Sequence, residues 1–238
     1  NTGIPYDSDK AVQFGEKLMK FLNDEARKAS NKLGEERGSF PNFERSTWKG
    51  NAKATRNATV TTIAPTGTIS IIAGATSGIE PLFAVTFVRD VLEGTHLLEA
   101  NPSFERIARQ KGFYSKALMM KIARTGKATG MKGVPRDVQR LFRTALEIAP
   151  EWHVKMQAAF QKHCDNAVSK TINLPQNATP QDVRKAYLLA YKLKCKGITI
   201  YRYGSKKEQV LYIGKTPDEM VSAKSEYAGG HICIECMF

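Results

Sequence analysis

Residues 61–70 read Thr61-Thr62-Ile63-Ala64-Pro65-Thr66-Gly67-Thr68-Ile69-Ser70 and join two kinds of local structure. The β-branched run at 59–64 predicts a short strand, because such side chains suit an extended, pleated backbone. Gly67 lets the backbone approach a ligand closely, and three hydroxyl side chains lie in the same few residues. If a helix begins here, its free N–H groups would face an anion. The segment therefore allows two interpretations: an ordinary Gly/Pro turn, which the pattern alone favours, and a phosphate-binding loop.

This loop is not a P-loop. It lacks the Gly-Lys-Ser/Thr ending that nucleotide-hydrolysing enzymes place on the phosphates and the magnesium ion. Nucleotide hydrolysis is therefore not indicated.

The segment before this loop predicts an amphipathic helix over residues 9–33. Asp7 and Ser8 are candidate N-caps, and Gly34 is a candidate stop. Steps of three and four residues place one apolar set on a common face: Ala11, Phe14, Leu18, Leu22, Ala26, Ala29 and Leu33.

Helices and short strands alternate after the loop as well. A capping box begins one of these helices at Thr179, and Pro150 suits the first turn of another. This alternation favours an α/β layer architecture. The expected helices cover 103–111, 115–124, 136–148, 150–167 and 180–194, and the expected strands cover 81–88, 170–174 and 198–201.

Composition narrows the class of protein. The chain has 238 residues, 42% of them apolar, which suffices for a sizeable core. No apolar run is long enough for a transmembrane helix, and the first residues show no secretory signal. Four cysteines are too few for a disulfide scaffold, so we expect a reducing, cytoplasmic compartment. The absence of an initial Met indicates processing or a segment of something longer.

Positive charge concentrates in one block. Residues 101–150 hold eleven Lys and Arg against three acids, a balance of +8 within a chain total of +13. Such a block can attract nucleic acid or a polyphosphate. It can equally be a solvated helical surface. The absence of interleaved aromatic residues favours the second interpretation, so a nucleic-acid partner is not expected.

The remaining reactive residues are few. Cys233 and Cys236 form a Cys-x-x-Cys pair that could close a disulfide or supply half of a zinc site. Only His231 lies nearby, so we expect no metal site and favour a redox dithiol over an incidental pair. Cys164 and Cys195 are isolated, which is typical of structural cysteines.

Other side chains with catalytic potential point to no further site. His163 falls on an apolar helix face and is interpreted as a core or interface histidine. Tyr201 and Tyr203 share one side of a strand and are interpreted as core or ligand-wall residues. No Ser-His-Asp order or paired-carboxylate motif stands out.

Six segments together resemble the class II ribonucleotide reductases, which depend on adenosylcobalamin. They occur in the family's order across about residues 1–213. The matching segments are Gly3–Ser8, Glu36–Pro41, Thr61–Ser70, Ser77–Pro81, Asp165–Pro175 and Lys196–Arg202.

The resemblance implies a fold and a reaction. The fold is the second half of a ten-stranded α/β barrel over residues 1–213, followed by a flexible tail over 214–238. The family reduces ribonucleotides to 2′-deoxyribonucleotides through a thiyl radical that cobalamin homolysis generates on a finger-loop Cys. The Asn-x-Cys-x-Glu finger loop does not occur here. The resemblance therefore places no radical residue in this chain and implies a partner: an N-terminal half that carries it.

Site residues carry over only in part. The resemblance assigns phosphate binding to Thr66, Gly67, Thr68, Ile69 and Ser70, and a reductant-tail dithiol to Cys233 and Cys236. It also implies a ribonucleoside di- or triphosphate substrate and a thioredoxin-like or other dithiol reductant. Class I relatives use two adjacent Tyr on the final strand. Because Tyr201 and Tyr203 are not adjacent, cobalamin-type initiation is favoured.

A second hypothesis stays open. The chain could be a catalytically inactive nucleotide- or nucleic-acid-binding module that kept the fold, and the basic block motivates this alternative. Under the first hypothesis, half a barrel would expose strand edges and apolar surface.

Overall fold

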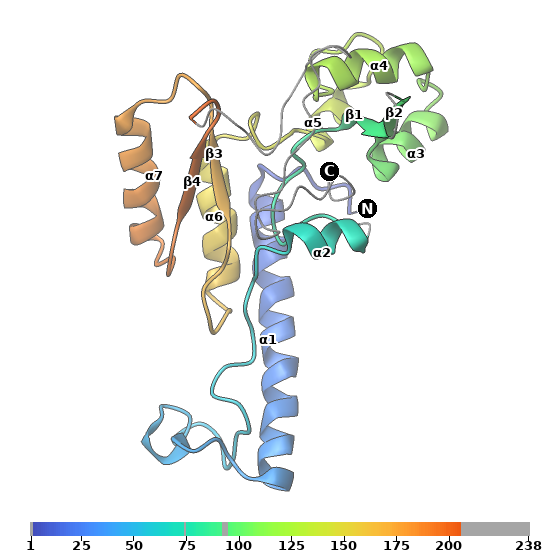
Figure 1. The fold of residues 1–238 in the computed structure, drawn as a ribbon. Helices are drawn as coiled ribbons and strands as arrows, with labels where there is room; N and C mark the ends of the chain where they lie inside the picture. Colours follow the sequence, from blue (N-terminus) through green and yellow to red (C-terminus); the bar gives the residue numbers. More distant parts are fainter. Residues whose placement is uncertain (1, 74, 92–94, 206–238) are drawn as a thin grey trace.

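The computed structural model describes residues 2–73, 75–91 and 95–205 (Figure 1). Strands β3 and β4 pair in parallel and are connected through α7, whereas β1 and β2 pair antiparallel. Helices and short strands alternate, which confirms the predicted α/β class. The elements are α1 (Asp9–Arg37), the short 3-10 helix η1 (Phe43–Arg45), α2 (Gly67–Ile72), β1 (Thr86–Val91), β2 (Thr95–Ala100), α3 (Pro102–Gln110), α4 (Lys116–Thr125), α5 (Arg136–Leu141), α6 (Pro150–Gln161), β3 (Thr171–Leu174), α7 (Pro180–Lys192) and β4 (Thr199–Arg202).

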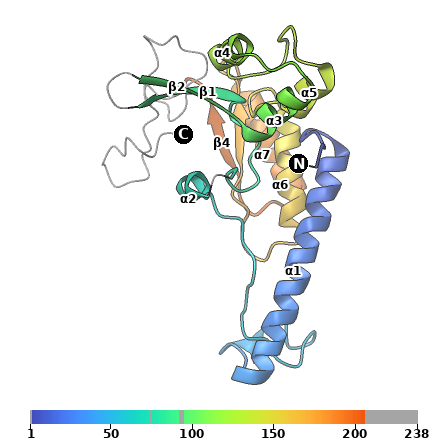
Figure 2. The same ribbon diagram turned by 90° about the vertical axis from the view of Figure 1, so that its right-hand side faces the viewer.

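Three apolar clusters hold these elements together. The sheet of β3 and β4 lies beside α6 and α7, α1 runs along α6 as a long stalk, and α3–α5 form a separate group (Figures 1 and 2). The largest cluster belongs to α3–α5 and is centred on Phe104 and Ile122. The other two join α1 to α6 through Met19 and Phe160, and α6 to β3 through Val154.

Helix α1 begins as predicted but ends later. The Ser8 side chain accepts a hydrogen bond from the Ala11 N–H at 3.2 Å, which confirms the N-cap. The predicted stop at Gly34 is wrong, because the helix ends at Gly38 with φ +82°. Gly34 is buried inside it, and a Cβ there would lie 2.6 Å from the Thr55 backbone nitrogen. This glycine therefore allows a close crossing of two backbone segments.

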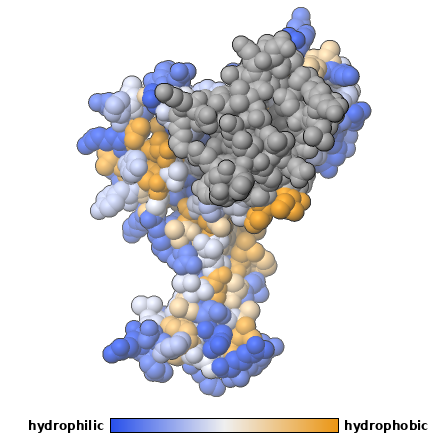
Figure 3. All heavy atoms as spheres, viewed as in Figure 1, coloured by the Kyte–Doolittle hydropathy of each residue, from blue (hydrophilic) through white to orange (hydrophobic). Residues whose placement is uncertain are grey.

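The predicted apolar face of α1 is also largely wrong. Phe14, Leu18 and Leu22 are 46, 41 and 47% exposed. The buried face is rotated towards small residues, because Phe160 of α6 packs directly over Gly15 and leaves no room for a larger side chain. Hydrophobic residues consequently remain on the surface near α2 and along the α1 stalk (Figure 3). The buried residues of α1 are Ala11, Gly15, Met19, Arg27, Ser30 and Gly34.

The predicted strand at 59–64 reduces to a single parallel bridge between Ile63 and Val168. Asp165 explains this difference. Its carboxylate accepts a hydrogen bond from the Val60 N–H at 2.7 Å, and its own N–H donates to the Thr61 hydroxyl at 3.1 Å. Side-chain hydrogen bonds thus take over at the start of the segment, and backbone hydrogen bonds to residues 166–169 follow from Thr61 to Ile63. The segment still runs extended beside the start of β3.

Three further boundaries differ from the predictions. The strand expected at 81–88 is β1, which begins only at Thr86, and β2 was not predicted. The helix expected over 136–148 ends at Leu141, because the Glu147 carboxylate binds the N–H and hydroxyl of Thr144 at 2.9 Å and shapes a turn there. Helix α6 ends at Gln161 rather than near residue 167.

The remaining predicted elements are confirmed, with small boundary shifts. Helices α3 and α4, strands β3 and β4, and the capping box between Thr179 and Asp182 lie where the sequence indicates.

The basic block of residues 101–150 is partly paired within the molecule. Asp7 is 5% exposed and lies 2.5 Å from Arg140 and 2.8 Å from Arg143. Lys111 pairs with Asp137 at 2.5 Å, and an i,i+4 pair within α3 involves a further arginine of the block. These contacts fit a solvated helical surface that also holds the N-terminal segment.

The described residues contain neither a membrane-spanning helix nor a metal-binding cluster. None of their helices combines the length and apolar character that crossing a membrane requires. They also contain no group of three or more His, Cys, Asp or Glu side chains arranged to hold a metal ion.

Candidate functional site

The candidate loop adopts a strained backbone. Thr66 has φ +52°, a left-handed conformation that is rare for a β-branched residue. Helix α2 begins at the next residue, and the Ser70 N–H donates to the Thr66 carbonyl at 3.0 Å. The amides of Gly67, Thr68 and Ile69 precede this bond, so they have no partner within the helix. Strain of this kind persists where the surrounding structure enforces it, often at functional sites.

A second segment enforces this conformation. The Gly78 N–H donates to the Thr66 hydroxyl at 2.8 Å, and the Ser77 hydroxyl donates to the Pro65 carbonyl. Gly78 itself has φ +46°. The hydroxyl of Thr66 therefore holds the shape of the loop through its contact with the 77–78 segment.

The structure brings the five predicted residues into one turn but gives them different roles. Gly67 is exposed, so its backbone is open to a ligand. Ile69 is 61% exposed and, being apolar, can offer only its amide. The Ser70 hydroxyl is buried and donates to the Gly67 carbonyl at 2.7 Å. Backbone amides are thus the loop's main donors towards an anion, and the hydroxyls of Thr66 and Ser70 stabilise it internally.

A buried ionic cluster lies where the segment after the loop meets β3. We call Glu80, His153, Lys170 and Thr171 the Lys170 cluster. The Lys170 ammonium pairs with the Glu80 carboxylate and donates to the Thr171 carbonyl at 2.5 Å. It also lies 2.8 Å from His153 Nδ1. The other Glu80 oxygen accepts the Thr171 N–H at 2.6 Å. Three segments that are distant in sequence, around Glu80, His153 and Lys170–Thr171, therefore meet at one cation.

Burial sets the protonation of this cluster. His153 is fully buried, and desolvation together with the Lys170 charge lowers the pKa of His153 to about 3. The neutral ring places its proton on Nε2, which donates to the Ala145 carbonyl at 3.0 Å, so Nδ1 accepts from Lys170. Burial also lowers the pKa of Lys170, while Glu80 opposes that shift. The cluster therefore contains an ion pair and a neutral imidazole.

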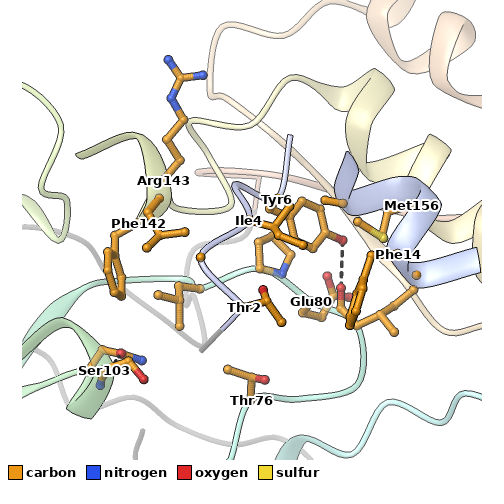
Figure 4. Close-up of a pocket in the computed structure, with 18 of the residues that line it drawn as sticks. Thr2, Ile4, Tyr6, Phe14, Thr76, Glu80, Ser103, Phe142, Arg143 and Met156 are labelled. Carbon is orange, nitrogen blue, oxygen red and sulfur yellow. Dashed lines mark hydrogen bonds between the residues drawn. The ribbon is translucent and has the colours of Figure 1, made fainter. Parts of the chain in front are cut away.

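A cavity of about 490 Å³ adjoins the cluster. Tyr6 and Glu80 reach it from different segments, and Ile4, Phe14 and Met156 form apolar walls (Figure 4). The Tyr6 hydroxyl donates to the Ile79 carbonyl at 2.8 Å, and burial raises its pKa. The phenol therefore stays protonated and supports the 79–80 segment.

The structure does not join the other predicted residues to this site. Cys233 and Cys236, like the tail predicted over 214–238, lie outside the described residues. Cys164 is buried, and Cys195 is half-buried with its pKa raised by desolvation, which fits the structural role predicted for both.

His163 lies at the contact between α6 and α1. It is half-buried, and its Nε2 lies 3.5 Å from a Glu16 oxygen. This position agrees with the interface histidine that the sequence indicated.

The sequence analysis did not single out Glu80, His153 or Lys170. Two signals were available. Glu80 and Lys170 both lie in segments that carry the family resemblance, and Lys170 directly precedes a strand whose side chains alternate in burial. A lysine at the start of a buried strand needs a counter-ion, and Glu80 supplies it.

A model of a protein family matches most of the chain. Its description is "Ribonucleotide reductase, barrel domain", and it covers residues 1–55 and 49–201. The matched range includes the candidate loop and the whole Lys170 cluster.

Curated relatives match along almost the whole chain. The vitamin B12-dependent ribonucleoside-diphosphate reductase of Mycobacterium tuberculosis is 50% identical over 99% of this chain and 33% of its own length. The enzyme of the same name from Thermoplasma acidophilum is 53% identical over 91% of this chain and 28% of its own length. The chain thus spans about a third of these relatives.

A solved structure shares the fold. The class Id ribonucleotide reductase alpha subunit of Actinobacillus ureae superposes with a TM-score of 0.71 at 24% identity. It covers 85% of this chain, which in turn covers 36% of that subunit. The architecture predicted from the sequence, a part of the reductase barrel, is confirmed by these matches.

Proposed function

The chain belongs to the ribonucleotide reductase family as part of its barrel domain, and from this we propose that it works within a vitamin B12-dependent ribonucleoside-diphosphate reductase. In that enzyme it supplies the loop that holds the phosphates of the substrate. The observation that carries the proposal is the strained Thr66 turn, which is followed by three amides without a partner within α2, in a segment matched by the family.

The chemistry of the loop suits a diphosphate. Backbone N–H groups at the start of a helix favour negative charge, and several amides can share one phosphate. Gly67 leaves room for close approach, since a Cβ there would meet nothing within 4 Å. The name of the relatives, ribonucleoside-diphosphate reductase, supports the diphosphate over the triphosphate as substrate.

We assign the cofactor to the assembled enzyme rather than to this chain alone. Adenosylcobalamin, which the names of the relatives imply, would supply the radical that starts ribose reduction. A corrin is a broad macrocycle, whereas the cavity beside Glu80 has a volume of about 490 Å³ and is divided among several segments. The described residues therefore do not form a complete site for the corrin.

The remainder of the barrel is the proposed partner. Phe14, Leu18 and Phe21 are 46, 41 and 61% exposed on one side of α1, a surface that a separate domain would normally bury. The parallel sheet described here has only two strands, fewer than an independently stable sheet usually needs. Both features support docking of further barrel strands and helices.

The tail proposal rests on the family resemblance alone. The resemblance also implies two further cysteines that deliver electrons to the ribose and become a disulfide. We propose that Cys233 and Cys236 receive electrons from a thioredoxin-like or other dithiol reductant and pass them to that disulfide by thiol–disulfide exchange. Replacing both by Ser should stop turnover with a protein reductant while preserving turnover with a small dithiol.

An assembly experiment tests the proposed function. The chain is combined with a matching N-terminal reductase segment, adenosylcobalamin and a dithiol, and deoxyribonucleoside diphosphate is measured. Each component omitted singly serves as a control. We expect product only in the complete mixture; its absence with every matching segment would reject the proposal. Salt-sensitive oligonucleotide binding in place of activity would favour the inactive binding module instead.

A further inference from the structure

Lys170 is buried and fully satisfied. It is 1% exposed, and an ammonium has three donors. They match three acceptors: the Glu80 carboxylate, His153 Nδ1 at 2.8 Å and the Thr171 carbonyl at 2.5 Å. A cation with all donors in use cannot take a ligand without losing a partner. Its contribution must therefore come through the groups that it holds.

Glu80 connects this cation to the candidate loop. One of its oxygens pairs with Lys170, and the other accepts the Thr171 N–H at 2.6 Å, so its carboxylate is fixed at two points on β3. Two residues earlier, the Gly78 N–H holds the Thr66 hydroxyl at 2.8 Å. The path from Lys170 to the strained Thr66 is therefore short and consists of polar contacts and a few backbone bonds.

The segment directly before β3 also holds the entry to the loop. The Ser169 N–H donates to the Ile63 carbonyl at 2.8 Å, and Ile63 forms the parallel bridge with Val168. The adjacent residue, Lys170, holds the exit at Glu80. Residues 64–79 thus leave and rejoin the fold at two consecutive residues of one chain segment. Fixing both ends limits the conformations that the loop can adopt.

We propose that Lys170 and Glu80 are positioning residues that set the geometry of the phosphate loop from the base of β3. Neither residue needs to touch the phosphates. This inference rests on the proposed function. It adds a pair of residues that fixes the position of the loop's exit at Glu80 relative to its entry at Ile63. Loss of the pair frees residues 64–79 at one end and relaxes the turn at Thr66.

Kinetics of the assembled reductase test the proposal. Lys170→Met and Glu80→Gln should each raise KM for the ribonucleoside diphosphate by about tenfold and change kcat by less than about twofold, because a displaced binding group weakens substrate binding. Lys162→Met is the matched control. Lys162 also pairs with a glutamate, Glu16, but its side chain is 63% exposed. Its KM should stay at the wild-type value.

The double variant separates positioning from folding. Lys170→Met with Glu80→Gln leaves no unpaired charge, so thermal stability should recover relative to the single variants. KM should nevertheless stay raised, and by no more than in either single variant, because the ion pair between Lys170 and Glu80 is absent in all three. Recovery of KM together with stability would overturn the proposal. So would single variants that lower only the folded fraction and keep the wild-type KM.

A readout without catalysis distinguishes this inference from the proposed function. Hydrogen–deuterium exchange of residues 64–79 is measured in the full chain with and without inorganic pyrophosphate. Exchange should rise in the double variant and stay unchanged in Lys162→Met. Faster exchange without reductase activity would retain the positioning role and reject the proposed function. Activity with unchanged exchange and KM would reject the positioning role alone.

Discussion

The candidate phosphate loop and the Lys170 cluster are both polar and lie close together in the fold, but they differ in exposure and in how their hydrogen-bond donors are used. The loop is exposed, strained at Thr66 and rich in backbone donors that α2 does not use. The cluster is buried, and each donor of Lys170 has an acceptor. Unsatisfied groups at a surface can bind a ligand, whereas satisfied groups in the interior can only hold structure. This difference is the basis for our proposals that the loop binds the substrate and that the cluster positions the loop.

The largest effect is expected on folding stability when the ion pair of the Lys170 cluster is broken. Lys170→Met leaves Glu80 without its cation and His153 without its donor. Breaking a fully buried pair typically costs about 3 kcal/mol or more, while an exposed pair contributes about 0–1 kcal/mol. Lys170 is fully buried but the Glu80 side chain is 26% exposed, so we expect a loss between these two figures. The midpoint of urea unfolding should therefore fall clearly for Lys170→Met and barely for the control Lys162→Met. Equal shifts would show that burial does not distinguish the two pairs.

The next largest effect is a loss of folding stability on acidification, which comes from His153. The folded pKa of His153 is about 3, below its ordinary value of 6.5. Between these values the unfolded chain binds a proton that the folded chain does not, so stability falls as the pH falls through this window. From pH 6.5 to pH 5 the loss should reach about 2 kcal/mol.

The variant His153→Gln isolates this contribution. It removes the titrating group while it keeps a donor and an acceptor. Unfolding free energies of both proteins should converge as the pH falls, because only the wild-type chain loses the histidine contribution. Parallel pH profiles would contradict the buried, neutral imidazole.

Smaller changes in stability and KM are expected from a substitution in the exposed loop. Thr66→Val removes the acceptor of the Gly78 N–H, which should cost about 1 kcal/mol in stability and raise KM for the diphosphate about threefold. Thr62→Val is the matched control. Thr62 lies in the same exposed segment, and its hydroxyl donates a hydrogen bond to the Ala167 carbonyl at 3.2 Å. Its KM should not change. A similar KM increase in both variants would argue against a special role for Thr66.

Local sequence rules predicted much of the fold. Ser8, Thr179 and Pro150 signal helix starts through their own side chains, and the structure confirms all three starts. The errors arise where distant residues decide. Gly34 reads as a stop but is needed for the crossing at Thr55, which lies far along the chain.

In the candidate site, too, local features could be predicted and features that depend on distant residues could not. The turn at 65–70 is local, so its residue types reveal it. The Lys170 cluster depends on a pair 90 residues apart in sequence, and no periodicity or short motif links them. The exposed face of α1 escaped prediction for a related reason. Apolar spacing indicates a face but not which surface covers it, and here α6 packs against the small residues instead.

The central claim is that this chain holds the phosphates of a reductase substrate at the Thr66 turn. Competition by inorganic pyrophosphate in the assembled enzyme tests it most directly. Pyrophosphate should compete with the ribonucleoside diphosphate, and its inhibition constant should rise in Thr66→Val by the same factor as KM, with no change in Thr62→Val. Inhibition that is not competitive, or that Thr66→Val leaves unaltered, would contradict the account.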